Sequence, residues 1–139
     1  HYLTKRPEEL LTEIRVPTRA GWTASYRKLR RRGAFDFPVL AVGAAIRVDG
    51  DRVAESRIVL GAVASAPVRA ARAEAALDGR PLDAGNIAEA AEAAAGPAKP
   101  MDNTDFSFLW RKEMTKKWVA AALSDLSRAV PAGTGTRPS

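Results

Sequence analysis

Residues Trp22 to Val42 read WTASYRKLRRRGAFDFPVLAV, and this stretch decides the fold. Five of the six residues from Arg27 to Arg32 are basic, aromatic side chains flank them, and an apolar segment follows without a break. A dense run of like charge in a folded domain is costly unless an anionic group lies nearby. The stretch therefore predicts a basic segment that leads into a buried strand, with an anionic partner or ligand close to it.

An Asp-Gly pair at positions 49–50 separates two segments with strand character, and such a pair is typical of a tight hairpin turn. Residues 39–48 are small and apolar, as in a strand covered on both faces, and residues 52–63 return after the turn. Residues 9–17 alternate apolar and polar side chains up to a proline, the pattern of a half-exposed strand. We therefore expect three antiparallel strands, at about 9–17, 39–48 and 52–63.

The rest of the sequence has helical character. Pro67 and Gly79 are placed to begin and end a first helix. Asp83 can cap a second helix, which the Gly-Pro pair at 96–97 would end. The helices are expected at about 67–78, 84–95 and 105–128.

Arg111 lies in the middle of the apolar face of the last predicted helix. A basic residue buried there must be paired, and Asp36 and Asp105 both remain candidates for its partner. Strands and helices together predict an α+β fold, a three-stranded antiparallel sheet packed against a three-helix bundle. Residues 1–129 would form a single domain, and residues 130–139 a disordered tail, because the tail lacks the apolar content to order it.

Composition narrows the possible functions. The chain has 139 residues with 46% apolar content, enough for one core, and a net charge of +6 that should attract anions. It has no cysteine, and its only histidine is His1, so thiol catalysis and cysteine-bound metal centres are excluded and a histidine-dependent metal site is disfavoured. It also has no phosphate-binding glycine loop or nucleophile elbow, which argues against catalysis by this chain alone. No apolar run approaches the roughly 20 residues of a membrane span, and we expect a cytoplasmic protein.

Four segments, in order along the chain, resemble one protein family. They are ELLTEIRVP at 9–17, SYRKLRRR at 25–32 with Asp36 after it, LGAVASAPVRA at 60–70 and WRKEM at 110–114. The chain resembles the C-terminal domain of the FAD-binding (medium) subunit of the molybdenum hydroxylases. This group includes carbon monoxide dehydrogenase, xanthine dehydrogenase and 4-hydroxybenzoyl-CoA reductase.

The resemblance implies a flavin site shared with other domains. In such subunits two preceding domains hold most of FAD, and the C-terminal domain closes over the isoalloxazine ring. Substrate is oxidised at molybdopterin in a large subunit, and electrons pass through [2Fe–2S] clusters of a small subunit to FAD. The resemblance therefore implies partner subunits, and a domain that contributes to electron transfer without being catalytic by itself.

The same resemblance assigns four candidate cofactor-binding residues. Tyr26 matches an aromatic residue at the flavin ring, where it would limit access to the ring. Arg27 and Lys28 match basic positions near the pyrimidine edge of the flavin, where a cation would stabilise negative charge on the reduced ring. Asp36 matches a recurring acidic residue after the basic run. Tyr26 as a plain packing residue remains an alternative, since aromatic side chains commonly serve that purpose.

Two other function classes stay open. The chain could be a non-catalytic docking module that holds partner subunits at the flavin. It could also be a basic nucleic-acid-binding domain, although none of the recognised basic motifs is present. Residues Arg30 to Arg32 fit a solvated or inter-subunit surface better than a flavin site, because crowded cations repel one another.

Overall fold

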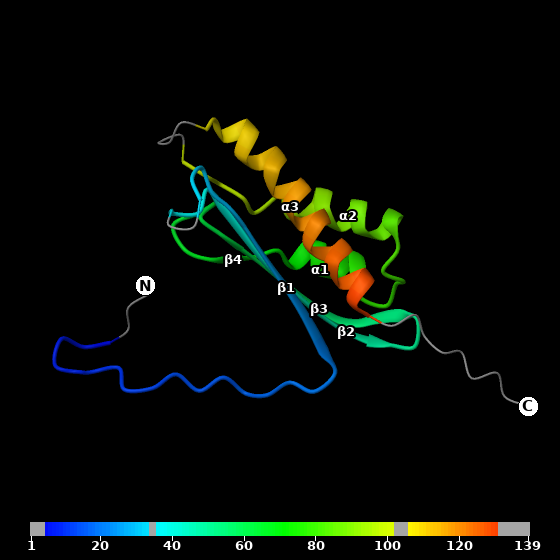
Figure 1. The fold of residues 1–139 in the computed structure, drawn as a ribbon, viewed down its shortest axis with the longest axis horizontal. Coiled ribbons are helices and arrows are strands. Elements are labelled where there is room, and N and C mark those ends of the chain that lie inside the picture. The colour runs from blue at the N-terminus through cyan, green and yellow to red at the C-terminus, as the bar shows by residue number, and fades with distance from the viewer. Residues whose placement is uncertain (1–4, 34–35, 102–105, 131–139) are drawn as a thin grey trace, which may run out of the picture.

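The computed structural model describes residues 5–33, 36–101 and 106–130. Within them, four antiparallel strands form one sheet in the order β1-β2-β3-β4, and three helices cover one face of it (Figure 1). The strands are β1 (Trp22–Leu29), β2 (Leu40–Asp49), β3 (Arg52–Gly61) and β4 (Val68–Arg69). The helices are α1 (Ala71–Leu77), α2 (Ala84–Ala94) and α3 (Phe108–Ala129).

The predicted hairpin is confirmed. β2 and β3 pair antiparallel on either side of the turn, and Gly50 has a φ of 60°, a left-handed conformation that glycine adopts without steric cost. The α+β class is also confirmed, but the sheet of the described residues has four strands and not three.

The strand expected at 9–17 is wrong. That segment has no strand pairing, and its apolar side chains point into solvent, with Leu10 84% exposed and Val16 83% exposed. The edge strand is instead β1, which contains the first half of the basic run and pairs with β2 along its whole length. Alternation shows that a segment can form a strand, but it does not say which sheet the strand joins.

Helix boundaries differ from the prediction mainly at the first helix. Residues at 68–69 form β4, which pairs with Val59 and Leu60 of β3, so α1 begins only at Ala71. The predicted cap of α2 is confirmed, because the Asp83 side chain accepts a hydrogen bond from the backbone N–H of Asn86 at 2.8 Å. α3 begins at Phe108 behind a Ser107 cap, and the expected start at 105 lies outside the described residues, as does most of the expected tail.

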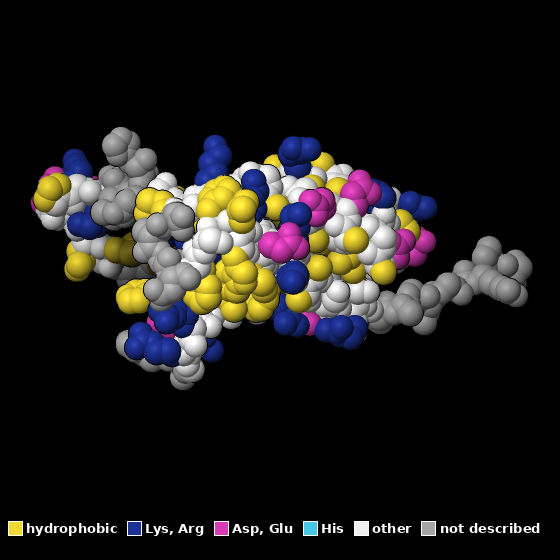
Figure 2. Space-filling model, turned by 90° about the horizontal axis from the view of Figure 1, so that it is seen from above, with side chains coloured by type: hydrophobic (Ala, Val, Ile, Leu, Met, Phe, Trp, Pro, Cys, Tyr) yellow, Lys and Arg dark blue, Asp and Glu magenta, His cyan; other side chains and the backbone are white. Residues whose placement is uncertain are grey.

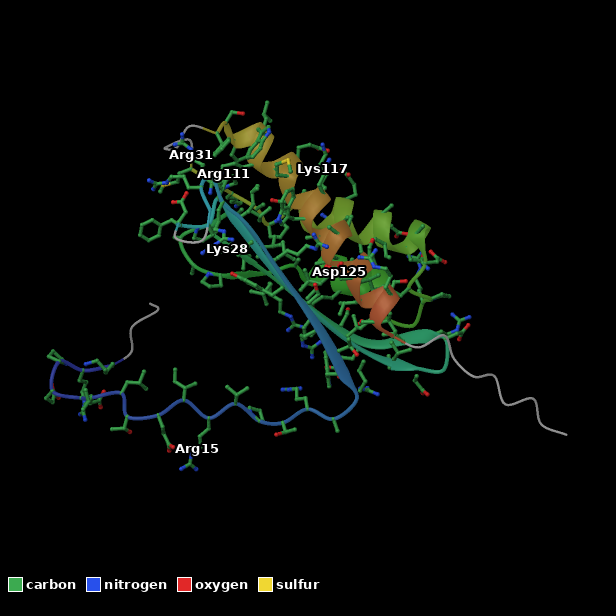
Figure 3. All side chains as sticks on the ribbon, in the orientation of Figure 1. Arg15, Lys28, Arg31, Arg111, Lys117 and Asp125 are labelled. Carbon is green, nitrogen blue, oxygen red and sulfur yellow. The ribbon has the colours of Figure 1, made fainter. Side chains whose placement is uncertain are left out.

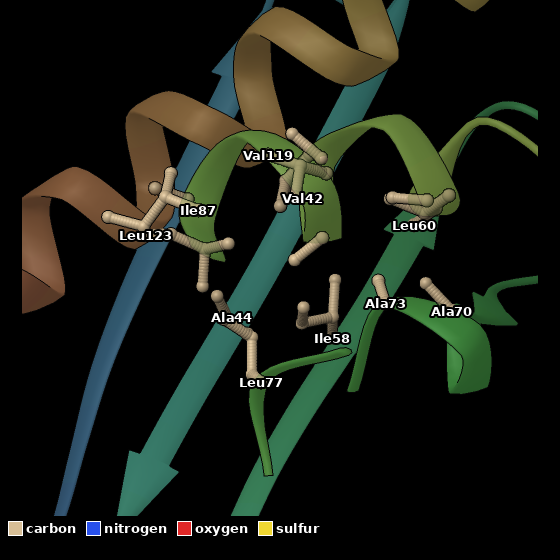
Figure 4. Packing of buried hydrophobic residues seen from close by; sticks show 14 of the residues in the cluster. Val42, Ala44, Ile58, Leu60, Ala70, Ala73, Leu77, Ile87, Val119 and Leu123 are labelled. Carbon is tan, nitrogen blue, oxygen red and sulfur yellow. The ribbon is translucent and has the colours of Figure 1, made fainter. Parts of the chain in front are cut away.

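The core lies between the sheet and the helices (Figure 4). β2 and β3 alternate between buried and accessible residues, and their buried side chains meet the apolar faces of all three helices. Alanines of α2 let the helices approach closely, since they bury little volume. The labelled residues of this cluster include Val42, Ala44, Ile58, Leu60, Leu77, Ile87, Val119 and Leu123.

Candidate functional site

The face of the sheet opposite the helices, which we name the open face, is not covered by the described residues. Its side chains come in two neighbouring rows that follow the strand register: Ala24, Ala45 and Arg57, then Tyr26, Gly43 and Val59. A shallow hollow of about 440 Å³ lies over these two rows. Around the hollow, the open face therefore consists of small side chains together with Tyr26, Val59 and Arg57, and the Arg57 guanidinium lies over the ring of Trp22.

Tyr26 is exposed on this face, with 66% of its surface accessible. It pairs with Gly43, and a Cβ atom built on Gly43 would meet nothing within 4 Å. Glycine inside a strand weakens the strand and often marks a site where another group approaches the backbone closely. The backbone next to the Tyr26 ring is therefore accessible to a flat group from outside the chain.

Lys28 lies on the same face as Tyr26, because side chains two apart on a strand point the same way. It is exposed, and no carboxylate among the described residues forms an ion pair with it. The structure therefore brings Tyr26 and Lys28 together on one surface.

Arg27 lies on the opposite face of β1, toward α3. Its guanidinium donates two hydrogen bonds to Asp125, at 2.6 Å from Nε to Oδ2 and 2.7 Å from a terminal nitrogen to Oδ1. Ser25 donates to the same carboxylate at 3.2 Å. These bonds lower the pKa of Asp125 to about 2 and raise the pKa of Arg27 above its ordinary value. Arg27 therefore fixes β1 to the helical layer, and it does not share a surface with Tyr26.

Asp36 belongs to the loop between β1 and β2. Its carboxylate accepts from the backbone N–H groups of Arg32 and Phe37, at 3.1 and 2.9 Å, and also from the Arg32 guanidinium. The hydrogen bonds from Arg32 lower the pKa of Asp36. Asp36 thus orders the loop that contains the end of the basic run.

The expected buried position of Arg111 is confirmed, but Asp36, one of its two candidate partners, does not pair with it. Arg111 is only 5% exposed, and its guanidinium donates to the backbone carbonyls of Val39, Ala62 and Met101. Asp36 pairs with Arg32 instead, and Asp105 lies outside the described residues. A helical pattern shows that a side chain points inward, but loop carbonyls can accept its hydrogen bonds as well as a carboxylate can.

Asp125, which anchors β1, was not among the residues expected at the site. Asp125 lies about four helical turns after Arg111, and therefore faces nearly the same way. An acidic residue on the inward side of a predicted helix indicates a buried basic partner, and this signal was available in the sequence. Figure 3 shows Arg111 at the same end of the molecule as Lys28 and Arg31, with Asp125 farther along α3.

Further features of the described residues concern metal binding, membrane spanning and surface charge. The described residues contain no cluster of three or more His, Asp or Glu side chains that could hold a metal ion. None of the helices within the described ranges is long and apolar enough to cross a membrane. On the side seen in Figure 2, Lys and Arg side chains are spread among acidic and apolar ones and form no continuous stripe.

A protein-family model matches most of the chain. The model of the CO dehydrogenase flavoprotein C-terminal domain matches residues 24–126. The glyceraldehyde dehydrogenase medium chain of Sulfolobus acidocaldarius is 27% identical over 119 residues, which are 86% of this chain and 42% of that protein. The aldehyde oxidoreductase FAD-binding subunit PaoB of Escherichia coli is 37% identical over 71 residues, which are 51% of this chain and 21% of PaoB. The chain thus spans less than half the length of these relatives.

Solved structures show the same fold. A chain of the carbon monoxide dehydrogenase from Hydrogenophaga pseudoflava, in a form that lacks the Mo-pyranopterin moiety of the molybdenum cofactor, aligns with a TM-score of 0.72 at 30% identity. This alignment covers 77% of the present chain and 37% of that chain. Quinoline 2-oxidoreductase from Pseudomonas putida 86 aligns with a TM-score of 0.75 at 26% identity, over 82% of this chain and 39% of that chain.

Proposed function

Because this chain belongs to the CO dehydrogenase flavoprotein C-terminal domain family, we propose that it is the C-terminal part of the flavoprotein subunit of a molybdopterin-dependent oxidoreductase. In this role the domain closes over FAD and docks partner subunits. The subunit would receive electrons from [2Fe–2S] clusters in a small partner subunit. Substrate oxidation would take place at molybdopterin in a large partner subunit.

The open face is the observation that supports this proposal. It offers a hollow of about 440 Å³, an accessible backbone at Gly43 and an exposed aromatic ring beside it. These features fit one side of a flat, partly apolar ring such as isoalloxazine, which needs shape and a few polar contacts more than many charges. When bound, FAD would supply the ability to take up two electrons and pass them to an acceptor.

Each of the four candidate residues has a different role in this proposal. Tyr26 packs beside the flavin ring and limits the access of solvent and acceptors to it. Lys28 supplies positive charge near the pyrimidine edge, where negative charge develops on reduction. Arg27 acts from the other face by holding β1 against Asp125, and Asp36 acts by ordering the loop after the basic run.

The remaining part of the site would come from domains outside this chain. FAD is anchored mainly through its pyrophosphate, and the sequence has no glycine-rich turn for that purpose. The segment 9–17 has strand-like alternation and exposed apolar side chains, so we propose that it packs onto the preceding FAD-binding domains. The absence of cysteine fits a reducing compartment, and we propose a cytoplasmic location.

One observation favours a docking role as the second candidate function. Large apolar side chains are exposed near the start of α3, with Leu109 75% and Met101 68% accessible. Apolar groups gathered on a surface commonly mark protein contacts. A domain that only docks subunits would use this surface and would not need Tyr26 or Lys28 at the flavin.

The test is a Tyr26→Ala variant in the complete, assembled enzyme. If Tyr26 shields the flavin ring, its loss should increase flavin reoxidation by dioxygen, while substrate-driven reduction begins at another subunit and keeps its rate. Stopped-flow spectroscopy follows the two half-reactions separately. Tyr26→Phe is the control, because it keeps the aromatic ring on the open face and removes only the hydroxyl.

Unchanged reoxidation in the Tyr26 variant would remove this residue from the flavin site. Lower yield and lower thermal stability, with normal flavin turnover per folded molecule, would show a packing role and favour the docking function.

A further inference from the structure

Arg111 is a buried cation that the proposed flavin chemistry does not use. It lies in the first turn of α3, and its guanidinium binds three backbone carbonyl groups. One terminal nitrogen donates to Met101 at 3.1 Å, and the other donates to Val39 at 2.9 Å and to Ala62. A single side chain thus joins three separate segments to α3.

The segments that Arg111 joins meet at one end of the sheet. Val39 directly precedes β2, and Ala62 directly follows β3. Met101 lies in the connection between α2 and α3. The strand register supports this arrangement, because Ala41 near the start of β2 pairs with Gly61 at the end of β3.

The burial of Arg111 is not explained by a gain in stability. No carboxylate of the described residues pairs with it, and its Nε has no hydrogen-bond partner. A buried charge without an ion pair is costly, and apolar residues of similar volume often stabilise a fold as well or better. Ala62, whose carbonyl it binds, has a φ of 64°, a left-handed conformation that is unfavourable for a residue other than glycine. The arrangement therefore favours defined loop positions over maximal stability.

One of these segments, at Val39, directly follows the basic loop, which we define as described residues 30–33 and 36–38. The loop follows Leu29, the last residue of β1, and Val39 connects it to β2, which begins at Leu40. The N–H of Val39 donates to the carbonyl of Leu29 at 2.8 Å, and its carbonyl accepts from Arg111. Val39 is thus hydrogen-bonded to β1 through its N–H and to α3 through its carbonyl.

We propose that Arg111 is a positioning residue for the basic loop. By holding Val39, Ala62 and Met101 to α3 at once, it sets where the loop lies relative to the open face. Lys28 stands where β1 leads into this loop, and Asp36 orders the loop from within. The consequence for flavin rests on the proposed function, whereas the positioning itself does not.

The test is amide hydrogen exchange in the complete flavoprotein subunit carrying Arg111→Met or Arg111→Lys. Methionine keeps most of the volume but donates no hydrogen bond, and a lysine ammonium cannot reproduce the planar fork of donors. Peptides covering 28–40 report on the basic loop, and peptides covering 49–55 report on the hairpin at the other end of the sheet. In both variants we expect exchange in 28–40 to rise about tenfold more than in 49–55, because only the local opening becomes easier.

Lys117→Met serves as the control on the same helix, because Lys117 is exposed. An equal rise in both peptides would show a purely structural role and overturn the proposal. Wild-type protection in Arg111→Lys would also overturn it, since charge alone would then suffice; this variant decides the question if Arg111→Met does not fold. A negative Tyr26 experiment would leave the exchange result untouched, so failure of the two proposals can be told apart.

Discussion

Asp125 shows how a single residue fixes the edge strand of the sheet. It accepts two hydrogen bonds from Arg27 and one from Ser25, both on β1, and a further one from Arg128 at 2.5 Å. Charge-assisted bonds with two parallel contacts are geometrically specific. Asp125 therefore holds β1 in the orientation that points Tyr26 and Lys28 to the open face.

The pKa of Asp125 predicts how stability depends on pH. Its value in the folded protein is about 2, below the ordinary value of 3.8, so the ionised carboxylate favours the folded state. This contribution is complete above the ordinary pKa and is lost as pH falls through the folded pKa. The Tm of Asp125→Asn should lie below that of the wild type at pH 7, and the difference should shrink between pH 4 and pH 2.

Thermal melts across this pH range check the prediction. Asp51→Asn is the control, because Asp51 is exposed in the hairpin turn. A Tm difference for Asp125→Asn that stays constant down to pH 2 would contradict the assigned role of the ion pair.

At the scale of elements, β3 and β4 are held together by a buried acid on α1. Glu74 is 4% exposed, and its carboxylate accepts from the backbone N–H of Ile58 at 2.8 Å and from the side chain of Arg69. This bond satisfies a strand N–H next to the point where the two-residue β4 begins to pair. Through Ile58 and Arg69 the Glu74 carboxylate thus joins α1 to both β3 and β4.

Glu74→Leu should lower the free energy of unfolding by about 1–3 kcal/mol, because the buried N–H of Ile58 loses its acceptor. Glu74→Gln keeps an acceptor oxygen and should cost less. Chemical denaturation measures both, with Glu89→Leu as the control, since Glu89 forms only an exposed ion pair with Arg80. Equal losses from Glu74→Leu and Glu89→Leu would mean that burial of Glu74 contributes nothing.

A substitution in the segment 9–17 should have different effects in the isolated 139 residues and in the complete subunit. Ile14 is 77% exposed in this chain, so Ile14→Lys should leave the stability of the 139 residues unchanged. In the complete subunit the same change should lower the yield of folded protein, since a charge would enter the proposed contact with the preceding domains.

Glu13→Lys is the matched control, because it puts a lysine on the other side of the same segment. Loss of yield in both variants to the same degree, or in neither, would argue against a strand-like contact at 9–17.

At the scale of the whole molecule, the domain should supply only part of a cofactor site. In the proposed function the open face contacts one side of the flavin ring, and the sequence has no glycine-rich turn that would hold the pyrophosphate. The purified 139 residues should therefore bind FAD weakly and lose it on desalting, as absorbance near the flavin band would show. A yellow protein with one FAD per chain would contradict this division of the site.

Much of the fold could be predicted from the sequence where the cause is local. The turn at Asp49 and Gly50 depends on backbone conformation at two residues, and the cap at Asp83 depends on an N–H three residues away. The apolar side chains of residues 39–48 indicate that this segment is buried, whichever element packs against it. The family resemblance could also be found from the sequence alone, because each of its four segments is a continuous run of residues and the segments follow one another in the family's order.

The tertiary structure decided which strand joins the sheet and which way the basic run faces. Residues 9–17 and 22–29 could each have formed the edge strand, and the choice depends on pairing with β2, a partner that lies farther along the chain. Once β1 is paired, alternation sends Arg27 to Asp125 and leaves Tyr26 and Lys28 on the open face. The partners of Arg111 were decided in the same way, because carbonyls distant in sequence come together only when the strand ends and α3 have packed. Local sequence determines which secondary structure a segment can form, whereas contacts between distant segments determine which residues it packs against.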